Sequence, residues 1–350
     1  MSRQLPRSGR AGLQRGAVVA RLAAFAVALV LLLALCSAAA IAWWLERPLP
    51  LNSAGAELSI ESGATPRQVA EAWVNAGVET SPRLLYEWFR WSGHARRIRA
   101  GSYQIDSATS PRQLLDKLVQ GDETLEHVRF IEGWTLRQLR AELERAPHLK
   151  PLSAGLDDAA LMAALGAPGV AAEGRFFPDT YAYSRGVSDL TVLKRAHAAL
   201  ESRLATVWAE RAADTPLRTA DEALTLASIV EKETGSAAER AQVAGVFVNR
   251  LRIGMPLQTD PTVIYGLGAA FDGNLRKRDL LANTPFNTYL RPGLPPTPIA
   301  LPGLASLRAA VRPEATKALY FVARGDGSSA FSDSLAEHNR AVNQYQRGVR

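Results

Sequence analysis

The alternation of hydrophobic and polar positions along the chain predicts an N-terminal apolar helix followed by many short amphipathic elements. Residues 22–45 carry no charge, and this apolar run is about long enough to cross a bilayer as a helix. Arginines precede the run and only Glu46 and Arg47 follow it closely, which places the N-terminus in the cytoplasm. We therefore expect a cytoplasmic basic tail (1–21) and a transmembrane anchor (22–45). Weaker alternatives are a signal peptide cleaved at Ala38–Ala40, a lipid anchor on Cys36 and a buried core helix.

A repeated pattern of strand, turn and helix begins after the apolar run. Each copy has Thr or Ser before the helix and an Arg-Gln pair inside it, and two copies have Pro at the favoured first helical position. The copies are IESGATPRQV (60–69), IDSATSPRQL (105–114) and FIEGWTLRQL (130–139), with helix starts at Thr65, Ser110 and Thr135. Small βα units of this kind cannot bury their apolar faces singly, so we expect them to pack together.

Aromatic side chains gather in a predicted helix from Pro82 to His94, between the first two copies. They either pack in the core, which is the simpler interpretation, or form a surface on which sugar rings stack. Pro147 and Pro151 then interrupt the repeat pattern. We place a soft domain boundary there, which gives domains 46–150 and 151–350.

The second domain alternates helices with short extended segments, which is typical of a mixed α+β fold. Predicted helices cover 157–165, 189–212, 220–235, 237–252, a stretch starting at Pro261, 304–311 and 334–346, with an extended segment at 173–183 and a strand at 318–323. Six prolines make segment 285–303 a stiff, polyproline-like loop. This loop is either a rigid surface strap or one wall of a groove for an extended polar polymer.

Composition and charge limit the partners and catalytic groups that the protein can have. The net charge of +7 and pI near 9.7 suit an anionic partner, but nucleic acid does not fit a domain beyond a membrane. The single cysteine, Cys36, lies inside the apolar run, so the exported part has no disulfide and no cysteine nucleophile. The five histidines lack metal-ligand spacing, and nucleotide-binding motifs are missing, so we expect neither metal nor cofactor. The remaining possibility is catalysis by the carboxyl groups of Asp and Glu side chains.

Glu231 is the strongest candidate for that chemistry. It lies on the helix that starts after Thr219, one turn after Ser228 on a stripe of small and apolar residues. Burial on this stripe and the negative end of the helix dipole both favour a raised pKa, which suits a general acid. The simpler alternative is an ordinary helix-end glutamate paired with Lys232 or Arg240.

Other carboxylates are weaker candidates. Glu233 is two residues from Glu231, so the two side chains point to different faces and cannot form a catalytic pair from one helix. Glu173, Asp179 and Asp260 complete the set.

These motifs resemble those of the membrane-anchored endolytic murein transglycosylases, the MltG or YceG-like family. The matching stretches are EGRFFPDTY (173–181), LASIVEKET (226–234), VFVNRLRIGMPLQTDPTVIYGLG (246–268), FNTYLRPGLPPTPIALPG (286–303) and FSDSLAEHNRAV (331–342). The resemblance extends over nearly the whole chain after the apolar run. Thr297 departs from the family, which more often has glycine there, and we expect this to alter loop shape rather than chemistry.

The resemblance implies a single-pass protein of the cell inner membrane, anchored by Leu22–Leu45, with its bulk in the periplasm. That bulk comprises a small LysM-like βα module (46–150) and a larger mixed α+β catalytic domain (151–350). The implied essential glutamate is Glu231. The residues that match motif positions, and that we expect to line the cleft, are Gln258, Thr259, Asp260, Asn287 and Tyr289.

The implied activity is non-hydrolytic cleavage inside nascent peptidoglycan strands, between N-acetylmuramic acid and N-acetylglucosamine. Protonated Glu231 donates to the glycosidic oxygen and, as a carboxylate, takes the proton of the muramic 6-hydroxyl, which attacks C1 of its own sugar. The 1,6-anhydro end terminates elongation, and an intramolecular nucleophile makes a second carboxylate unnecessary. Penicillin-binding synthases are candidate partners. The alternatives are a lysozyme-like hydrolase that pairs Glu231 with Asp260 or Asp179, and an inactive glycan-binding scaffold.

Overall fold

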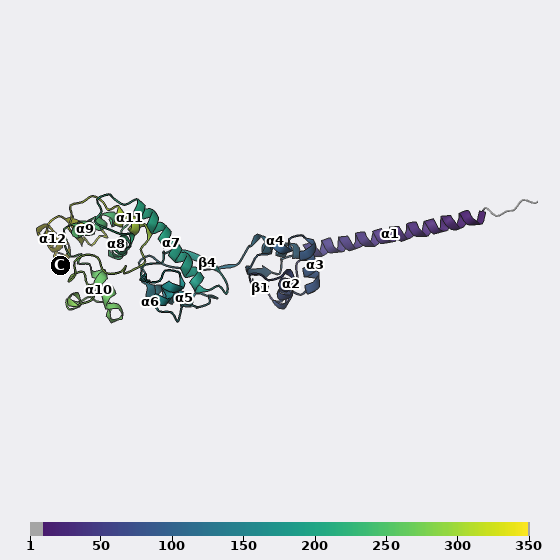
Figure 1. The fold of residues 1–350 in the computed structure, drawn as a ribbon, viewed down its shortest axis with the longest axis horizontal. Helices are drawn as coiled ribbons and strands as arrows, with labels where there is room; N and C mark the ends of the chain where they lie inside the picture. The colour runs from purple at the N-terminus through teal and green to yellow at the C-terminus, as the bar shows by residue number, and fades with distance from the viewer. Residues whose placement is uncertain (1–9, 349–350) are drawn as a thin grey trace, which may run out of the picture. The chain divides into compact units, whose positions relative to one another are not determined.

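The computed structural model describes residues 10–348, with side chains from residue 21 onward. Helix α1 (Arg10–Glu46) contains the predicted apolar run (Figure 1). Its segment Arg21–Glu46 is 26 residues long and unburied, so by length and composition it fits a single membrane span or a signal sequence. Residues 1–9 of the expected basic tail lie outside the described residues.

The chain divides into two compact units, residues 1–124 and 125–350, whereas the sequence placed the boundary near residue 150. The third repeat copy accounts for the difference. Its strand β3 (Leu125–Arg129) pairs antiparallel with β4 (Thr180–Ser184), so this copy belongs to the second unit. Repeats specify local structure well, but they do not specify which strand each copy pairs with.

The first unit is built from the first two copies and the aromatic helix between them. Its elements are β1 (Gly55–Ile60), α2 (Pro66–Asn75), α3 (Pro82–Trp91), β2 (Gly101–Asp106) and α4 (Pro111–Gln120), with a short 3-10 turn at Ala95–Arg97. β1 and β2 pair antiparallel, with Ile60 opposite Gly101. On α3, Phe89 is fully buried but Trp91 is 77% exposed, so this helix serves both the core and the surface.

All three helix starts of the repeat have the predicted cap. Thr65, Ser110 and Thr135 each accept a hydrogen bond from the backbone N–H of the glutamine three residues later, and that glutamine's side chain accepts from the cap residue's N–H. This reciprocal capping box satisfies two otherwise unpaired donors at each helix start. The repeat is therefore a structural motif of helix initiation.

The second unit is a layered assembly of helices with two small antiparallel sheets (Figure 1). Besides β3 and β4, its elements are α5 (Leu136–Arg145), α6 (Asp158–Ala164), α7 (Asp189–Ala209), α8 (Ala220–Glu233), α9 (Arg240–Arg252), α10 (Asp260–Leu267), α11 (Leu304–Val311), β5 (Tyr320–Ala323), β6 (Ser329–Ser332) and α12 (Leu335–Val342). Short 3-10 turns lie at Gly268–Ala270 and Asp279–Leu281, and a π-helical turn follows α12 at Asn343–Arg347. The mixed class expected from the sequence is confirmed.

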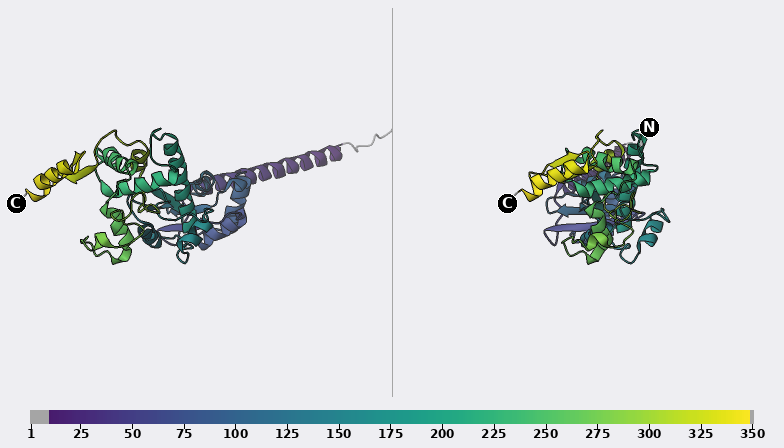
Figure 2. Two further views of the ribbon diagram at one scale, coloured as in Figure 1. Left: turned by 60° about the vertical axis from the view of Figure 1, so that its left-hand side comes forward. Right: turned by 90° about the vertical axis from the view of Figure 1, so that its left-hand side faces the viewer.

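Helix α8 is the centre of the second unit. It packs against α7, α9, α10 and α11, and every residue from Ala223 to Val230 is buried. One apolar stripe in the sequence predicts burial of one helix face, so it does not predict a helix that is buried on all sides. In contrast, α12 has no buried residue and extends from the edge of the unit in both views of Figure 2.

Candidate active site

Glu231 lies in the last turn of α8, where the helix leaves the core. Its side chain is only 7% exposed, as expected for a carboxyl on the buried stripe that contains Ser228. Thr219 caps the start of α8 by accepting from the N–H of Glu222 at 3.1 Å, so the predicted start of the helix is confirmed. The helix ends at Glu233, two residues before the expected Gly235.

Two donors hold one oxygen of the Glu231 carboxyl. Oε2 accepts hydrogen bonds from the Gly303 backbone N–H (2.9 Å) and from the Ser306 hydroxyl (2.7 Å). Oε1 accepts no hydrogen bond from the described residues, and Nη2 of Arg240 lies 3.9 Å from it. Lys232 points elsewhere, since its ammonium donates to the carbonyl of Gly133. The carboxyl is therefore oriented through Oε2, while Oε1 is left for another group.

The proline-rich loop supplies the Gly303 donor because it is fastened to α8. The N–H of Ile299 donates to the Ser228 hydroxyl at 3.0 Å. Leu301 exchanges backbone hydrogen bonds with the turn of the third repeat copy, donating to Trp134 O and accepting from Gly133 N. Of the two interpretations left open for this loop, the wall of a site fits these contacts better than a rigid surface strap, because the loop supplies a donor to the Glu231 carboxyl.

Glu132 is a second carboxylate beside Glu231 that sequence reasoning did not identify. Its carboxyl lies against Gly303, where a Cβ on that glycine would overlap it. Partial desolvation, and then the charge of Glu231, raise the pKa of Glu132, while Arg240 opposes the shift. A signal was present in the repeat, because Ser62 and Ser107 stand where the third copy has Glu132.

Of the five residues expected to line the cleft, Thr259 contacts Glu233 and Asp260 and Tyr289 lie near it, whereas none of the five hydrogen-bonds the carboxyl of Glu231 within the described residues. The Thr259 hydroxyl donates to Oε2 of Glu233 at 2.7 Å, and the Tyr289 hydroxyl donates to Asp260 at 2.6 Å. Thr259 therefore precedes α10 without capping it through its side chain. Burial raises the pKa of Glu233, and the hydrogen bond from Thr259 opposes this.

Two more of the five residues differ sharply in exposure. Asn287 is fully buried, and its amide donates to the carbonyls of Leu280 and Ala282. That side chain holds its own loop together. The Gln258 side chain is exposed to solvent. Its backbone adopts the left-handed conformation, with φ of 48°, which is uncommon for a residue other than glycine. Gln258, Asp260 and the half-buried Tyr289 are thus the members that a ligand can reach most directly.

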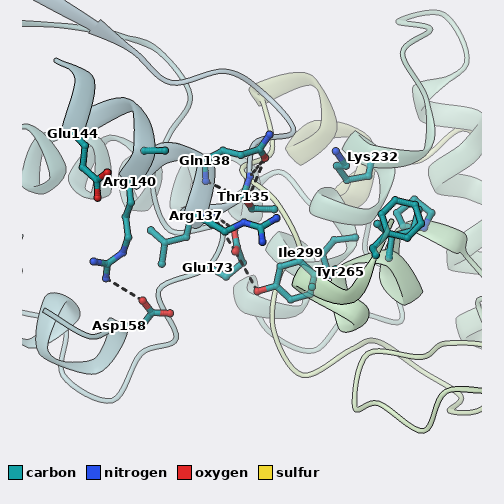
Figure 3. Close-up of a pocket in the computed structure, with 16 residues that line it drawn as sticks. Thr135, Arg137, Gln138, Arg140, Glu144, Asp158, Glu173, Lys232, Tyr265 and Ile299 are labelled. Atoms are coloured by element: carbon teal, nitrogen blue, oxygen red, sulfur yellow. Dashed lines mark hydrogen bonds and ion pairs between the residues drawn. The ribbon is translucent and has the colours of Figure 1, made fainter. Parts of the chain in front are cut away.

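Glu173 lines a cavity of about 960 Å³ beside the end of α8 (Figure 3). The N–H of Leu136 donates to both of its oxygens (2.9 and 3.2 Å), and the Tyr265 hydroxyl donates to Oε2 at 3.2 Å. Burial raises the pKa of Glu173 to about 7, although these hydrogen bonds oppose the shift. Gly174 must be glycine, because its φ is +76° and a Cβ would overlap Pro298.

The remaining carboxylate candidate, Asp179, is exposed. Its Oδ1 accepts from the N–H of Thr180, and Arg203 lies 3.8 Å from Oδ2. Within the described residues, no group of three or more His, Cys, Asp or Glu side chains has the geometry to hold a metal ion.

The fold and the site define a mixed α/β protein with a buried, oriented glutamate at a helix end. A model of the YceG-like family matches residues 58–344, and the chain belongs to this family. An endolytic murein transglycosylase of Bacillus subtilis (strain 168) is 31% identical over 310 residues, which are 82% of this chain and 84% of the relative. An endolytic murein transglycosylase of Streptococcus pneumoniae serotype 2 is 25% identical over 361 residues, 92% of this chain but only 65% of the relative.

A solved structure is also similar. The crystal structure of a YceG-like protein from Listeria monocytogenes matches with a TM-score of 0.51 and 26% identity, covering 82% of this chain and 98% of that chain.

Proposed function

We propose that this protein is an endolytic lytic transglycosylase of peptidoglycan and that Glu231 is its acid and base. The observation that carries the proposal is the asymmetry of the Glu231 carboxyl. Gly303 and Ser306 hold Oε2, and Oε1 accepts no hydrogen bond from the described residues. The names of the Bacillus and Streptococcus relatives support the same activity and substrate.

In the proposed reaction, the proton resides on Oε1 of Glu231 and passes to the glycosidic oxygen between muramic acid and glucosamine. The C1–O bond breaks as the oxocarbenium-like centre develops. The carboxylate formed is stabilised by Gly303 N–H, Ser306 and the nearby charge of Arg240. Oε1 then accepts the proton of the muramic 6-hydroxyl while that oxygen bonds to C1. Water does not enter, and the product ends in 1,6-anhydro-muramic acid.

A second catalytic carboxylate is unnecessary because the nucleophile belongs to the substrate itself. Neither of the two carboxylates weighed for a lysozyme-like reaction contacts Glu231 within the described residues. Asp260 accepts from Tyr289, and Asp179 accepts from the Thr180 N–H beside Arg203. This favours the lyase over the hydrolase. We further propose that Gln258, Asp260 and Tyr289 contact the glycan, whereas Thr259 and Asn287 support their loops.

The location follows from α1. We propose that Leu22–Leu45 anchors the protein in the inner membrane with its N-terminus in the cytoplasm, so that the enzyme meets nascent strands in the periplasm and terminates their elongation. The β1–α2–α3–β2 arrangement of the first unit suits a LysM-like module that binds glycan. Penicillin-binding synthases are the proposed partners.

The test is mass spectrometry of purified murein digested by the purified protein. We expect anhydro ends from the wild type and no release by Glu231→Gln, which retains an oxygen for Gly303 and Ser306 but cannot donate and accept the proton. Glu222→Gln, the same change at the exposed start of α8, is the matched control and should cut like the wild type. Reducing ends would assign a hydrolase. Binding without cleavage by the wild type would assign a scaffold.

A further inference from the structure

The cavity beside α8 adjoins Glu231 without including its carboxyl. Lys232 lines the cavity, and Gly133 packs against both residues: a Cβ on Gly133 would lie 3.7 Å from Lys232 Cδ and 3.9 Å from Glu231 Cγ. The cavity is formed by α5, α10 and the end of α8, all within the second unit. A group bound there would lie against Lys232, which follows the proposed catalytic Glu231 directly in the chain.

The two ends of this cavity differ in charge. At the end beside Glu231, Arg137 and Lys232 extend toward one another from α5 and α8 (Figure 3). Neither forms an ion pair with a described residue, and Lys232 bonds only the carbonyl of Gly133. At the opposite end Arg140 is neutralised by Asp158 at 3.0 Å, and Glu144 remains as an exposed anion.

Between the two ends, the carboxyl that lines the cavity is not free to bind a ligand. Glu173 is enclosed by donors from Leu136, Gly174 and Tyr265. Because its pKa is about 7, its negative charge is only partly present at neutral pH. Tyr265 and Phe271 add apolar surface to the same cavity. The cationic end therefore suits a ligand that carries carboxylates on a partly apolar body.

We propose that this cavity receives the acidic peptide substituent of a muramic acid residue, with its carboxylates bound by Arg137 and Lys232. The inference rests on the proposed function and deepens it. In murein the sugar chain carries short peptides whose carboxylates lie near the lactyl ether, and a free amine farther along suits the Glu144 end. Arg137 carries a guanidinium group, which can donate two parallel N–H hydrogen bonds to one carboxylate. The enzyme would thus recognise the peptide substituent as well as the sugar chain of its substrate.

The experiment compares soluble glycan strands that carry their peptides with the same strands after enzymatic removal of the peptides. Wild type should cut the intact strands roughly ten-fold faster in kcat/KM, the factor expected from one charge-assisted hydrogen bond. Arg137→Ala should lower the rate on intact strands toward the rate on stripped strands, because only Lys232 remains to bind the peptide carboxylates, and should leave the rate on stripped strands unchanged. Arg145→Ala is the matched control, the same change on the same helix away from the cavity.

Equilibrium binding decides the inference even if no strand is cut. In the Glu231→Gln background, intact strands should bind roughly ten-fold tighter than stripped strands, and adding Arg137→Ala should remove most of the difference. Equal binding of the two strands, or an equal loss on both in Arg137→Ala, overturns the peptide site. Absence of anhydro products with either substrate contradicts the proposed activity, whereas the binding comparison independently determines whether the cavity holds the peptide.

Discussion

The Thr259 hydroxyl donates a 2.7 Å hydrogen bond to Oε2 of Glu233, whereas Glu231, on the same helix end, is held by Gly303 and Ser306. The two glutamates of one short motif therefore have separate surroundings. Glu231 keeps one carboxyl oxygen without a hydrogen bond from the described residues, and Glu233 ties α8 to the start of α10. The carboxyl that we propose to be catalytic and the carboxyl that joins α8 to α10 thus lie only two residues apart in the sequence.

Thr259→Val should lower the free energy of unfolding by about 2 kcal/mol, because the partly buried carboxylate of Glu233 loses a charge-assisted hydrogen bond. Thr259→Ser retains the hydroxyl and is the control, with a loss of less than about 1 kcal/mol. Urea denaturation monitored by tryptophan fluorescence measures both. Equal stability of the Val and Ser variants would show that the hydrogen bond is not what holds α10.

Ser306→Ala should reduce kcat by roughly ten-fold with little change in KM, because one of two donors that orient Glu231 is removed before and during proton transfer. The fold should survive, since Gly303 N–H still donates to Oε2. Steady-state release of muropeptides measures the two constants. A rise in KM at constant kcat would instead mean that Ser306 contacts the glycan.

Gly303→Ala should be destabilising by less than about 1 kcal/mol, through a collision with the flexible Glu132 side chain and not through backbone strain. The φ of Gly303 is −74°, which alanine adopts freely, while the added Cβ overlaps the Glu132 carboxyl. Glu132→Ala alone should change stability little, because Glu132 is exposed. The double variant should regain the stability of wild type, and a strictly additive cycle would refute the contact.

Glu173 should make stability fall as pH rises. Its pKa is about 7 in the folded protein against an ordinary 4.5, so the folded state binds the extra proton between these values. The favourable contribution is complete below about pH 4.5 and is lost as pH rises through about 7, a change of about 3 kcal/mol. Urea unfolding from pH 5 to 8 measures the slope. Glu173→Gln should flatten it, and an unchanged slope would assign the dependence to other groups.

Much of the local structure could be predicted because its causes are local. The start of α8 follows from Thr219, and α11 has the predicted bounds, Leu304–Val311. The three helix starts of the repeat follow from one cap residue and one glutamine each. The domain boundary could not be predicted in this way, since it depends on which strand β3 pairs with.

The site was predictable only in part. The sequence pointed to the burial of Glu231, although α8 is buried on all sides, so the single stripe was not the real cause. The donors to Glu231 were not predicted, because Gly303 is 72 residues away along the chain and the approach is set by tertiary packing. Thr259 and Glu233 were both identified as motif residues, but the hydrogen bond between them was not predicted.

The contacts that fasten the proline-rich loop have a consequence for the synthesis and folding of the chain. Residues 133, 231 and 303 come from widely separated parts of the sequence, and each must be in place before the carboxyl is oriented. A chain emerging N-terminus first therefore cannot assemble the proposed catalytic centre until almost all of it has been made and folded. Such late assembly would spare the cell wall from cutting by unfinished molecules.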